Sequence, residues 1–140
     1  MFLRGYMKLS KKDEELIEIA TKIVKENCNI YPSANLHVAC ALRAKSGKVY
    51  VGINLKTSHS VCAEQVAIGQ AFACGEREFE SIVAVQLDTN LDPHVVSPCG
   101  LCRYTFTKLK LNFKVIVPQG KKLTKVNIKE LLPFPYVKQG

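Results

Sequence analysis

Three cysteines and one glutamate have the types and spacing of a hydrolytic zinc site. Cys62 and Glu64 are separated by a single alanine, and Cys99 and Cys102 lie three residues apart after a proline. Three protein ligands on Zn²⁺ leave the fourth tetrahedral position for water, and the bound metal lowers the pKa of that water toward ~7. Glu64 then stands beside the first ligand as the candidate group for moving protons. The pattern predicts Zn²⁺ as a cofactor.

Two other interpretations of these cysteines stay open. In a closed structural site, His59 or His94 would be the fourth zinc ligand, and the chain would be a non-enzymatic, zinc-stabilised binding module. Alternatively, the Cys-x-x-Cys pair at residues 99–102 would be a redox couple. A closed site does not need Glu64, and a redox pair uses neither Glu64 nor Cys62. The hydrolytic site is the interpretation that uses all four residues.

The metal ligands are expected at two helix starts. A helix over residues 61–74 is so rich in apolar side chains that we expect it to be buried, with Gly75 ending it, and a further helix begins near Cys99. The N–H groups and the positive dipole end of a helix start lower thiol pKa values, and they offset the charge of three thiolates on one dication. Arg103 is the first candidate for additional positive charge near the metal.

The remaining elements predict an α/β fold. A capping box formed by Ser10 and Asp13 introduces a helix at residues 13–27. Strands are expected at residues 36–44 and 48–54 as a hairpin, at 81–87, at 114–117 where Pro118 ends the strand, and at 123–126, with a loop at 88–98 and a helical turn at 128–132. The first hairpin should be antiparallel and the strands joined by helices parallel, which gives a mixed sheet.

Length and composition predict a single domain over residues 1–140. The 140 residues are 47% hydrophobic, enough for a core without disulfides, so Cys28, Cys40 and Cys74 are expected to be ordinary buried or half-buried thiols. The chain has no apolar run of membrane-spanning length and no secretory signal at its start, so we expect a cytoplasmic protein that does not contact a membrane.

The charge of the chain makes an anionic partner worth considering. The formal net charge is +8, but the lysines are scattered and mixed with acidic residues, without a dense basic run or an aromatic-interleaved stripe. Nucleic acid is therefore an unlikely partner, and hydrolytic chemistry on a nucleic acid base is kept as an alternative function.

Several stretches carry a resemblance to a known family. Residues 52–54 (Gly-Ile-Asn), 62–64 (Cys-Ala-Glu), 97–103 (Ser-Pro-Cys-Gly-Leu-Cys-Arg) and 130–133 (Glu-Leu-Leu-Pro) occur in the order found in cytidine deaminases, and the C-terminal segment is similar to that of the blasticidin-S deaminase branch. The resemblance implies a three-layer α/β/α sandwich with a mixed five-stranded sheet. It also implies zinc-dependent hydrolytic deamination of a free cytosine nucleoside or analogue, with Glu64 transferring the protons.

The resemblance also implies substrate contacts and an assembly. It assigns the backbone N–H of Ala63 to the pyrimidine oxygen, the backbone carbonyl of Ser97 to the leaving amino group, and Asn54 to the sugar. It further implies a homotetramer in which neighbouring chains complete each pocket, with the tail at residues 134–140 as a contributor.

The chain departs from the nucleoside branch at three positions. Lys56 stands where that branch has a ribose-binding glutamate, Leu36 where it has a phenylalanine that packs against the base, and Gln65 where it often has an arginine. Lys56 is suited to pair with a carboxylated sugar such as that of blasticidin S, and Tyr136 matches a tyrosine of that branch, although Lys138 replaces the aromatic residue that follows it. The structural alternatives are a solvated loop lysine at Lys56, a tail-packing role for Tyr136, and a turn role for Asn54.

Overall fold

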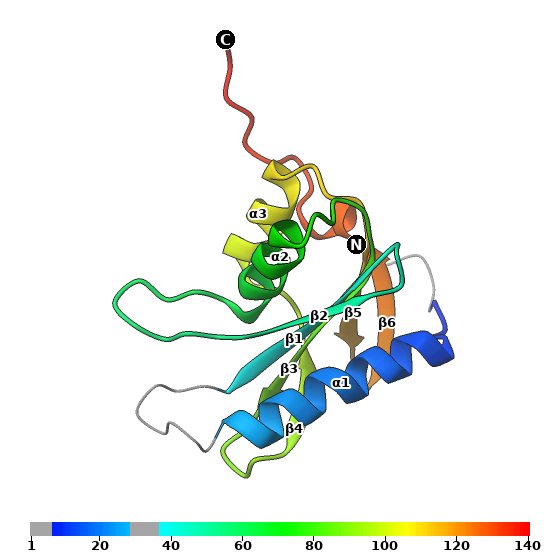
Figure 1. Ribbon diagram of the computed structural model, residues 1–140. Coiled ribbons are helices and arrows are strands. Elements are labelled where there is room, and N and C mark those ends of the chain that lie inside the picture. Colours follow the sequence, from blue (N-terminus) through cyan, green and yellow to red (C-terminus); the bar gives the residue numbers. More distant parts are fainter. Residues whose placement is uncertain (1–6, 29–36) are drawn as a thin grey trace.

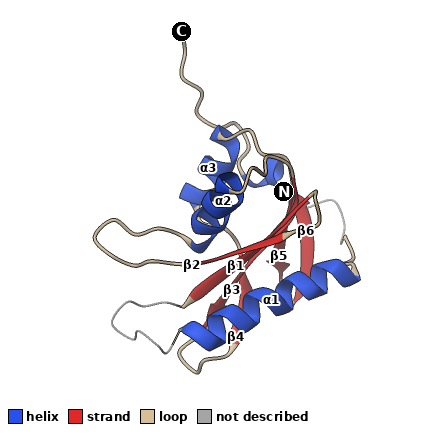
Figure 2. Cartoon of the chain, viewed as in Figure 1, coloured by secondary structure: helices blue, strands red, loops and turns tan. Residues whose placement is uncertain are grey.

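A mixed β-sheet with helices on both faces forms the frame of the protein. The computed structural model describes residues 7–28 and 37–140. Its strands follow the order β2-β1-β3-β5-β6. The remaining strand, β4, lies outside this order and pairs with β3. Helix α1 lies on one face, and helices α2 and α3 lie on the other (Figure 1 and Figure 2). The expected three layers are confirmed, with six strands in the described part of the chain instead of five.

Helix α1 (Lys11–Asn27) begins at the predicted capping box. The Ser10 hydroxyl accepts from the backbone N–H of Asp13, and the Asp13 carboxylate accepts from the backbone N–H of Ser10. The same carboxylate accepts from Lys125 at 2.7 Å, which connects the helix to β6. The buried side of α1 packs on the sheet in an apolar cluster made of Leu16, Ala20, Val24, Ala39, Ala41, Val83, Val85, Leu87 and Ile116.

The predicted hairpin consists of β1 (Val38–Ala44) and β2 (Val49–Ile53), paired antiparallel with Cys40 opposite Gly52. Leu36, predicted as the first residue of this hairpin, lies outside the described residues. At Gly52, helix α2 (Ala63–Ala73) lies against the backbone of β2. A Cβ at Gly52 would overlap the carbonyl oxygen of Ala63 and lie 2.6 Å from the backbone nitrogen of Ala67.

Burial of α2 is less complete than the sequence predicted. Ala63, Ala67 and Ala71 recur at helical spacing on the buried side, whereas Gly69 and Gln70 are exposed, so the prediction of a fully buried helix is wrong for this chain. The apolar residues are spread around the helix and only one side meets the sheet. Gly75, with φ of 88°, follows its C-cap and ends the helix as predicted.

The segment after β3 (Phe79–Leu87) contains a strand that the sequence analysis missed. Residues 88–98 were expected to be a loop, but Pro93–Val96 forms β4, antiparallel to β3 with Val96 opposite Ala84. Four residues beginning with proline, with a histidine next, carry too weak an alternation to indicate a strand. The consequence is functional, because β4 runs back along β3 and delivers the chain to Cys99.

The last elements complete the sheet. Helix α3 (Gly100–Lys108) connects to β5 (Lys114–Gln119), which lies parallel to β3, and β6 (Lys122–Asn127) leads into the 3₁₀ turn η2 (Ile128–Leu131). Pro118 was expected to end its strand but lies within β5. It can do so because β5 pairs with β3 only through Lys114 and Val115, so the missing N–H of Pro118 removes nothing from that ladder.

The cysteines outside the zinc motif differ in exposure. Cys28 is half-buried and Cys40 is buried, as predicted, whereas Cys74 at the C-cap of α2 is exposed, which contradicts the prediction for that residue. Among the described residues, no helix combines the length and apolar character that crossing a membrane requires.

Candidate active site

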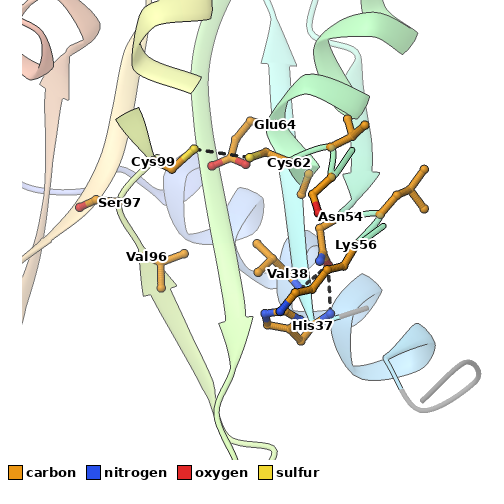
Figure 3. A pocket seen from close by; sticks show the side chains of 13 residues that line it. His37, Val38, Asn54, Lys56, Cys62, Glu64, Val96, Ser97 and Cys99 are labelled. Atoms are coloured by element: carbon orange, nitrogen blue, oxygen red, sulfur yellow. Dashed lines mark hydrogen bonds between the residues drawn. The ribbon is translucent and has the colours of Figure 1, made fainter. Parts of the chain in front are cut away.

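The starts of α2 and α3 bring the three predicted metal ligands together. Cys62 is the N-cap of α2, Cys99 is the N-cap of α3, and Cys102 follows in the first turn of α3. Their sulfur atoms all lie within 4.8 Å of one another, and the Sγ atoms of Cys62 and Cys99 are 3.4 Å apart (Figure 3). The two N-cap positions direct both sulfurs to the same place, where they can share a ligand.

This sulfur triangle fits tetrahedral zinc. Zn–S bonds of about 2.3 Å at tetrahedral angles place ligand sulfurs roughly 3.8 Å apart, which falls within the observed spacing. In the described part of the chain this is the one cluster of three or more histidine, cysteine or acidic residues suited to a metal. Neither His59 nor His94 belongs to this cluster, and His94 is paired with Asp88 at 2.7 Å, so the geometry does not support a fourth histidine ligand from these two positions.

The three thiols differ in their ease of ionisation. Burial raises the pKa of Cys62 to about 11, and the neighbouring Cys99 adds to the effect. Burial and the charge of Glu64 raise the pKa of Cys102. Burial acts in the same direction on Cys99, but hydrogen bonds from the backbone N–H of Cys102 and from the Cys62 thiol outweigh it and lower the pKa of Cys99. A bound dication must therefore displace protons, chiefly from Cys62 and Cys102.

Glu64 lies in the first turn of α2 with only 6% of its surface exposed. Its carboxylate is next to the sulfur atoms (Figure 3), and none of the ion pairs among the described residues includes it. Burial raises the pKa of Glu64. A buried carboxylate without a cationic partner is costly to the fold, which is typical of a group retained for proton transfer.

Two backbone features direct the chain to this site. Leu55 and Val61 form an isolated antiparallel bridge, with N···O distances of 3.0 and 2.8 Å, which closes the loop at residues 56–60 immediately before Cys62. On the other side, β4 ends at Val96, and Ser97 and Pro98 follow directly before Cys99. A closed loop and a strand end thus fix the entry angles of both helices.

A cavity of about 310 Å³ opens at the sulfur cluster, within the size range of small-molecule sites. Four predicted substrate contacts line it: Asn54, Lys56, Ala63 and Ser97. It also contains residues that the sequence analysis did not identify, namely His37, Val38, Leu55, Ser60, Val61 and Val96. The valines form apolar walls suited to the faces of a ring. His37 and Val38 reach the cavity because they lead into β1, opposite Asn54, which a register prediction for the hairpin would have indicated.

Tyr136 does not join this cavity within its own chain. It is 72% exposed and belongs to the tail that extends away from the body of the molecule (Figure 1). Its predicted contact with substrate would therefore require the pocket of a neighbouring chain.

Asn54 is held in one orientation. Its Oδ1 accepts from the backbone N–H groups of His37 and Val38, both at 3.0 Å, and its own backbone N–H donates to the carbonyl of Val38. These bonds fix the amide so that its oxygen faces the backbone of β1.

Arg103, expected to add positive charge near the metal, makes two hydrogen bonds to backbone carbonyls beside the site. Its Nε donates to the carbonyl of Pro98 at 2.8 Å, and its Nη1 donates to the carbonyl of Leu131 at 3.2 Å. The side chain therefore connects η2 to the residue before Cys99, where it positions the backbone of a metal ligand. The dipoles of the two helix starts are the positive groups directed at the sulfurs.

Comparison with known proteins agrees with this geometry. Residues 10–117 match the family model described as the cytidine and deoxycytidylate deaminase zinc-binding region. Blasticidin-S deaminase from Bacillus cereus is 33% identical over 139 residues, which cover 93% of this chain and 96% of that protein. Cytidine deaminase from Shewanella sediminis is 31% identical over 110 residues, and those cover 75% of this chain but 33% of that protein.

Solved structures give the same result. The crystal structure of cytidine deaminase from Burkholderia pseudomallei superimposes with a TM-score of 0.69 at 28% identity and covers 91% of this chain and 100% of that chain. The structure from Bacillus anthracis, at 19% identity and a TM-score of 0.68, shares the fold. The zinc-binding family model and the sulfur cluster together identify Zn²⁺ as the cofactor. The chain belongs to the cytidine and deoxycytidylate deaminase family.

Proposed function

We propose that the chain catalyses zinc-dependent hydrolytic deamination of the cytosine ring in a free nucleoside or nucleoside analogue, with release of ammonia. The observation that carries the proposal is the buried carboxylate of Glu64 beside three clustered sulfurs at one end of a 310 Å³ cavity with apolar walls. Zinc held by Cys62, Cys99 and Cys102 would supply a Lewis acid that activates water near neutral pH.

Three polar groups of the cavity have a role in this reaction. Glu64 takes a proton from water and delivers it to the ring nitrogen, and it then transfers the proton of the added hydroxyl to the departing amine, which leaves as ammonia while the ring carbonyl forms. The backbone N–H of Ala63, in the first turn of α2, has no partner within its helix and can donate to the ring carbonyl oxygen. The backbone carbonyl of Ser97, which lines the cavity opposite Asn54 in Figure 3, can accept from the amino group.

The test is an ultraviolet assay of deamination with cytidine, deoxycytidine and blasticidin S in parallel. Glu64→Gln should lower kcat by about 10²- to 10⁴-fold, the usual contribution of general acid–base catalysis, while zinc content stays at one per chain. Glu80→Gln removes the same charge from an exposed position on β3 and should leave turnover unchanged. Equal turnover by Glu64→Gln and the parent protein would refute the assigned role, and no turnover of any of the three compounds by the zinc-loaded protein would refute the substrate assignment.

We further propose that residues 1–140 act as one domain and assemble as a homotetramer in the cytoplasm. Support for the assembly comes from the exposed side of α2 and from the tail, where Phe134, Tyr136 and Val137 are 99%, 72% and 62% exposed. Tyr136 would then contact substrate in the pocket of a neighbouring chain. Support for the compartment comes from the site, because three zinc-binding thiols must stay reduced.

Light scattering coupled to size-exclusion chromatography tests the assembly. The parent protein should have the mass of four chains, and a variant ending at Pro133 should lose activity. Full deaminase activity of a protein that is monomeric at micromolar concentration would contradict the shared pocket.

A further inference from the structure

A side-chain hydrogen bond joins the two helices that carry the metal ligands. Helices α2 and α3 lie on the same face of the sheet (Figure 1), and the Nε2 of Gln65 in α2 donates to the Oγ1 of Thr105 in α3 at 3.3 Å. Within the described part of the chain, no other side-chain hydrogen bond joins these helices, apart from the contact between the sulfurs of their N-caps. Both residues are half-buried, so water competes only partly for the bond.

Each end of this bond lies about one helical turn beyond a metal ligand. Gln65 follows Cys62 by three residues, and Thr105 follows Cys102 by three residues. Cys102 and Phe106, on either side of Thr105, are fully buried, so this part of α3 cannot turn freely. The bond therefore constrains the separation of α2 and α3 next to the sulfur atoms.

Gln65 acts through geometry and not through charge. It stands where the nucleoside branch often has an arginine, but an amide is neutral and cannot offset the charge of three thiolates. Without zinc, the N-cap sulfurs of the two helices are joined only by a thiol contact, and a thiol is a weak donor. The bond from the amide to the hydroxyl is then the stronger of the two connections.

We propose that the bond between Gln65 and Thr105 holds the zinc-free site at the spacing that zinc requires, which makes both of them positioning residues for the metal. Without the bond the two helices can separate before zinc binds, and binding must bring them together again. Zinc affinity should then fall by about three- to tenfold, the equivalent of one neutral hydrogen bond. The inference rests on the zinc site and not on the substrate, so it is tested separately from the deamination of cytosine.

A double-mutant cycle tests the role of this bond. Thr105→Val removes the hydroxyl and nearly keeps the shape, Gln65→Met removes the amide and keeps an unbranched side chain, and Thr105→Ser keeps the hydroxyl. Thr107→Val is the matched control, because the Thr107 hydroxyl donates to the carbonyl of Arg103 within α3. Competition with a chromophoric chelator measures zinc affinity for each variant, and chemical denaturation of the zinc-free proteins measures their stability.

Cadmium distinguishes positioning from a general loss of stability. Cd²⁺ is larger than Zn²⁺ and accepts a wider triangle of sulfur atoms, so helices that can separate should weaken zinc binding more than cadmium binding. A loss of stability alone would weaken the binding of both metals by the same factor. The same chelator competition measures both affinities.

The expected result is an equal loss of zinc affinity in Thr105→Val and Gln65→Met, no further loss in the double variant, and a smaller loss for cadmium. Thr105→Ser and Thr107→Val should keep the affinity of the parent protein. Additive losses in the double variant, unchanged zinc affinity in both single variants, or equal losses for the two metals overturn the inference. Failure of the proposed function has a different signature, which is the absence of ammonia release from cytosine nucleosides by the zinc-loaded parent protein.

Discussion

Gly52→Ala tests whether the contact between β2 and α2 positions the zinc site. The added Cβ would overlap the carbonyl oxygen of Ala63, lie 2.6 Å from the nitrogen of Ala67 and lie 3.0 Å from the Cβ of Val66. The first two neighbours are backbone atoms, so they cannot rotate away. Reaching an ordinary contact of 3.4 Å with the nitrogen of Ala67 requires the strand and the helix to separate by at least about 0.8 Å, and relieving the overlap with the oxygen of Ala63 requires more.

That separation has two measurable consequences. Overpacking of this kind costs about 1–3 kcal/mol of the free energy of unfolding, which chemical denaturation of the zinc-free protein measures. The helix that moves begins at Cys62 and carries Glu64, and a displacement of about 1 Å lowers turnover on the order of 10²-fold. A chelator competition for zinc reports on the position of Cys62, and the ultraviolet deamination assay reports on the position of Glu64.

Gly69→Ala is the matched control for this substitution. Gly69 lies in the same helix, is exposed, and has no atom within 4 Å of an added Cβ. Alanine should raise the free energy of unfolding by about 0.5–1 kcal/mol through helix propensity and leave zinc affinity unchanged. A Gly52→Ala protein as stable and as active as Gly69→Ala would show that the close approach does not exist in solution, and the positioning argument would fail.

Three further predictions concern a metal ligand, the residue that positions the backbone before another ligand, and an ion pair of the fold. Cys102→Ser should lower zinc affinity by more than about a hundredfold, measured by metal analysis after competition with a chelator. Replacing residues that only hydrogen-bond to the metal ligands already lowers affinity by up to about that factor. Arg103→Gln should lower zinc affinity by about 10- to 100-fold, and Arg103→Lys should restore little of it, since an ammonium lacks the fork that reaches the carbonyls of both Pro98 and Leu131. Asp13→Asn should cost about 2 kcal/mol of unfolding free energy at pH 7 by leaving Lys125 without its charged partner. Burial would raise the pKa of Asp13, but the bonds from Lys125 and Ser10 outweigh it and hold the pKa below 3.8, so this stability is present above about pH 4, and the difference between the two proteins should disappear as the pH falls through the folded pKa.

The parts of the structure predicted well from sequence are those with strong local signals. The capping box at Ser10 and Asp13 located α1, and the spacing of Cys62, Cys99 and Cys102 identified a cluster that forms only after folding. The zinc motif was readable because few residue types bind this metal and each helix start holds its sulfur at a fixed place. The local pattern and the tertiary arrangement therefore agree at these positions.

The parts that were missed depend on contacts distant in sequence. Strand β4 exists because β3 offers a free edge beyond its short pairing with β5, and its own four residues carry little strand preference. Arg103 was expected near the metal because it follows Cys102, but its bond to Leu131, 28 residues later, is a tertiary contact that no local pattern indicates. Likewise, the fixed amide of Asn54 depends on backbone donors 16 and 17 residues earlier.

The two faces of the sheet separate stability from chemistry. The cluster under α1 and the cluster under α2 and α3 share the strands but no helix, and Cys102 and Phe106 belong to the second. A loss at Asp13 acts on α1 and β6, whereas a loss at Gly52 moves α2 directly. Two variants with equal losses of unfolding free energy, one at each position, should therefore differ in zinc affinity, with only the Gly52 variant weakened. Equal losses of zinc affinity in the two variants would mean that the sheet transmits strain from one face to the other. The zinc site would then depend on the stability of the whole fold instead of on the position of α2.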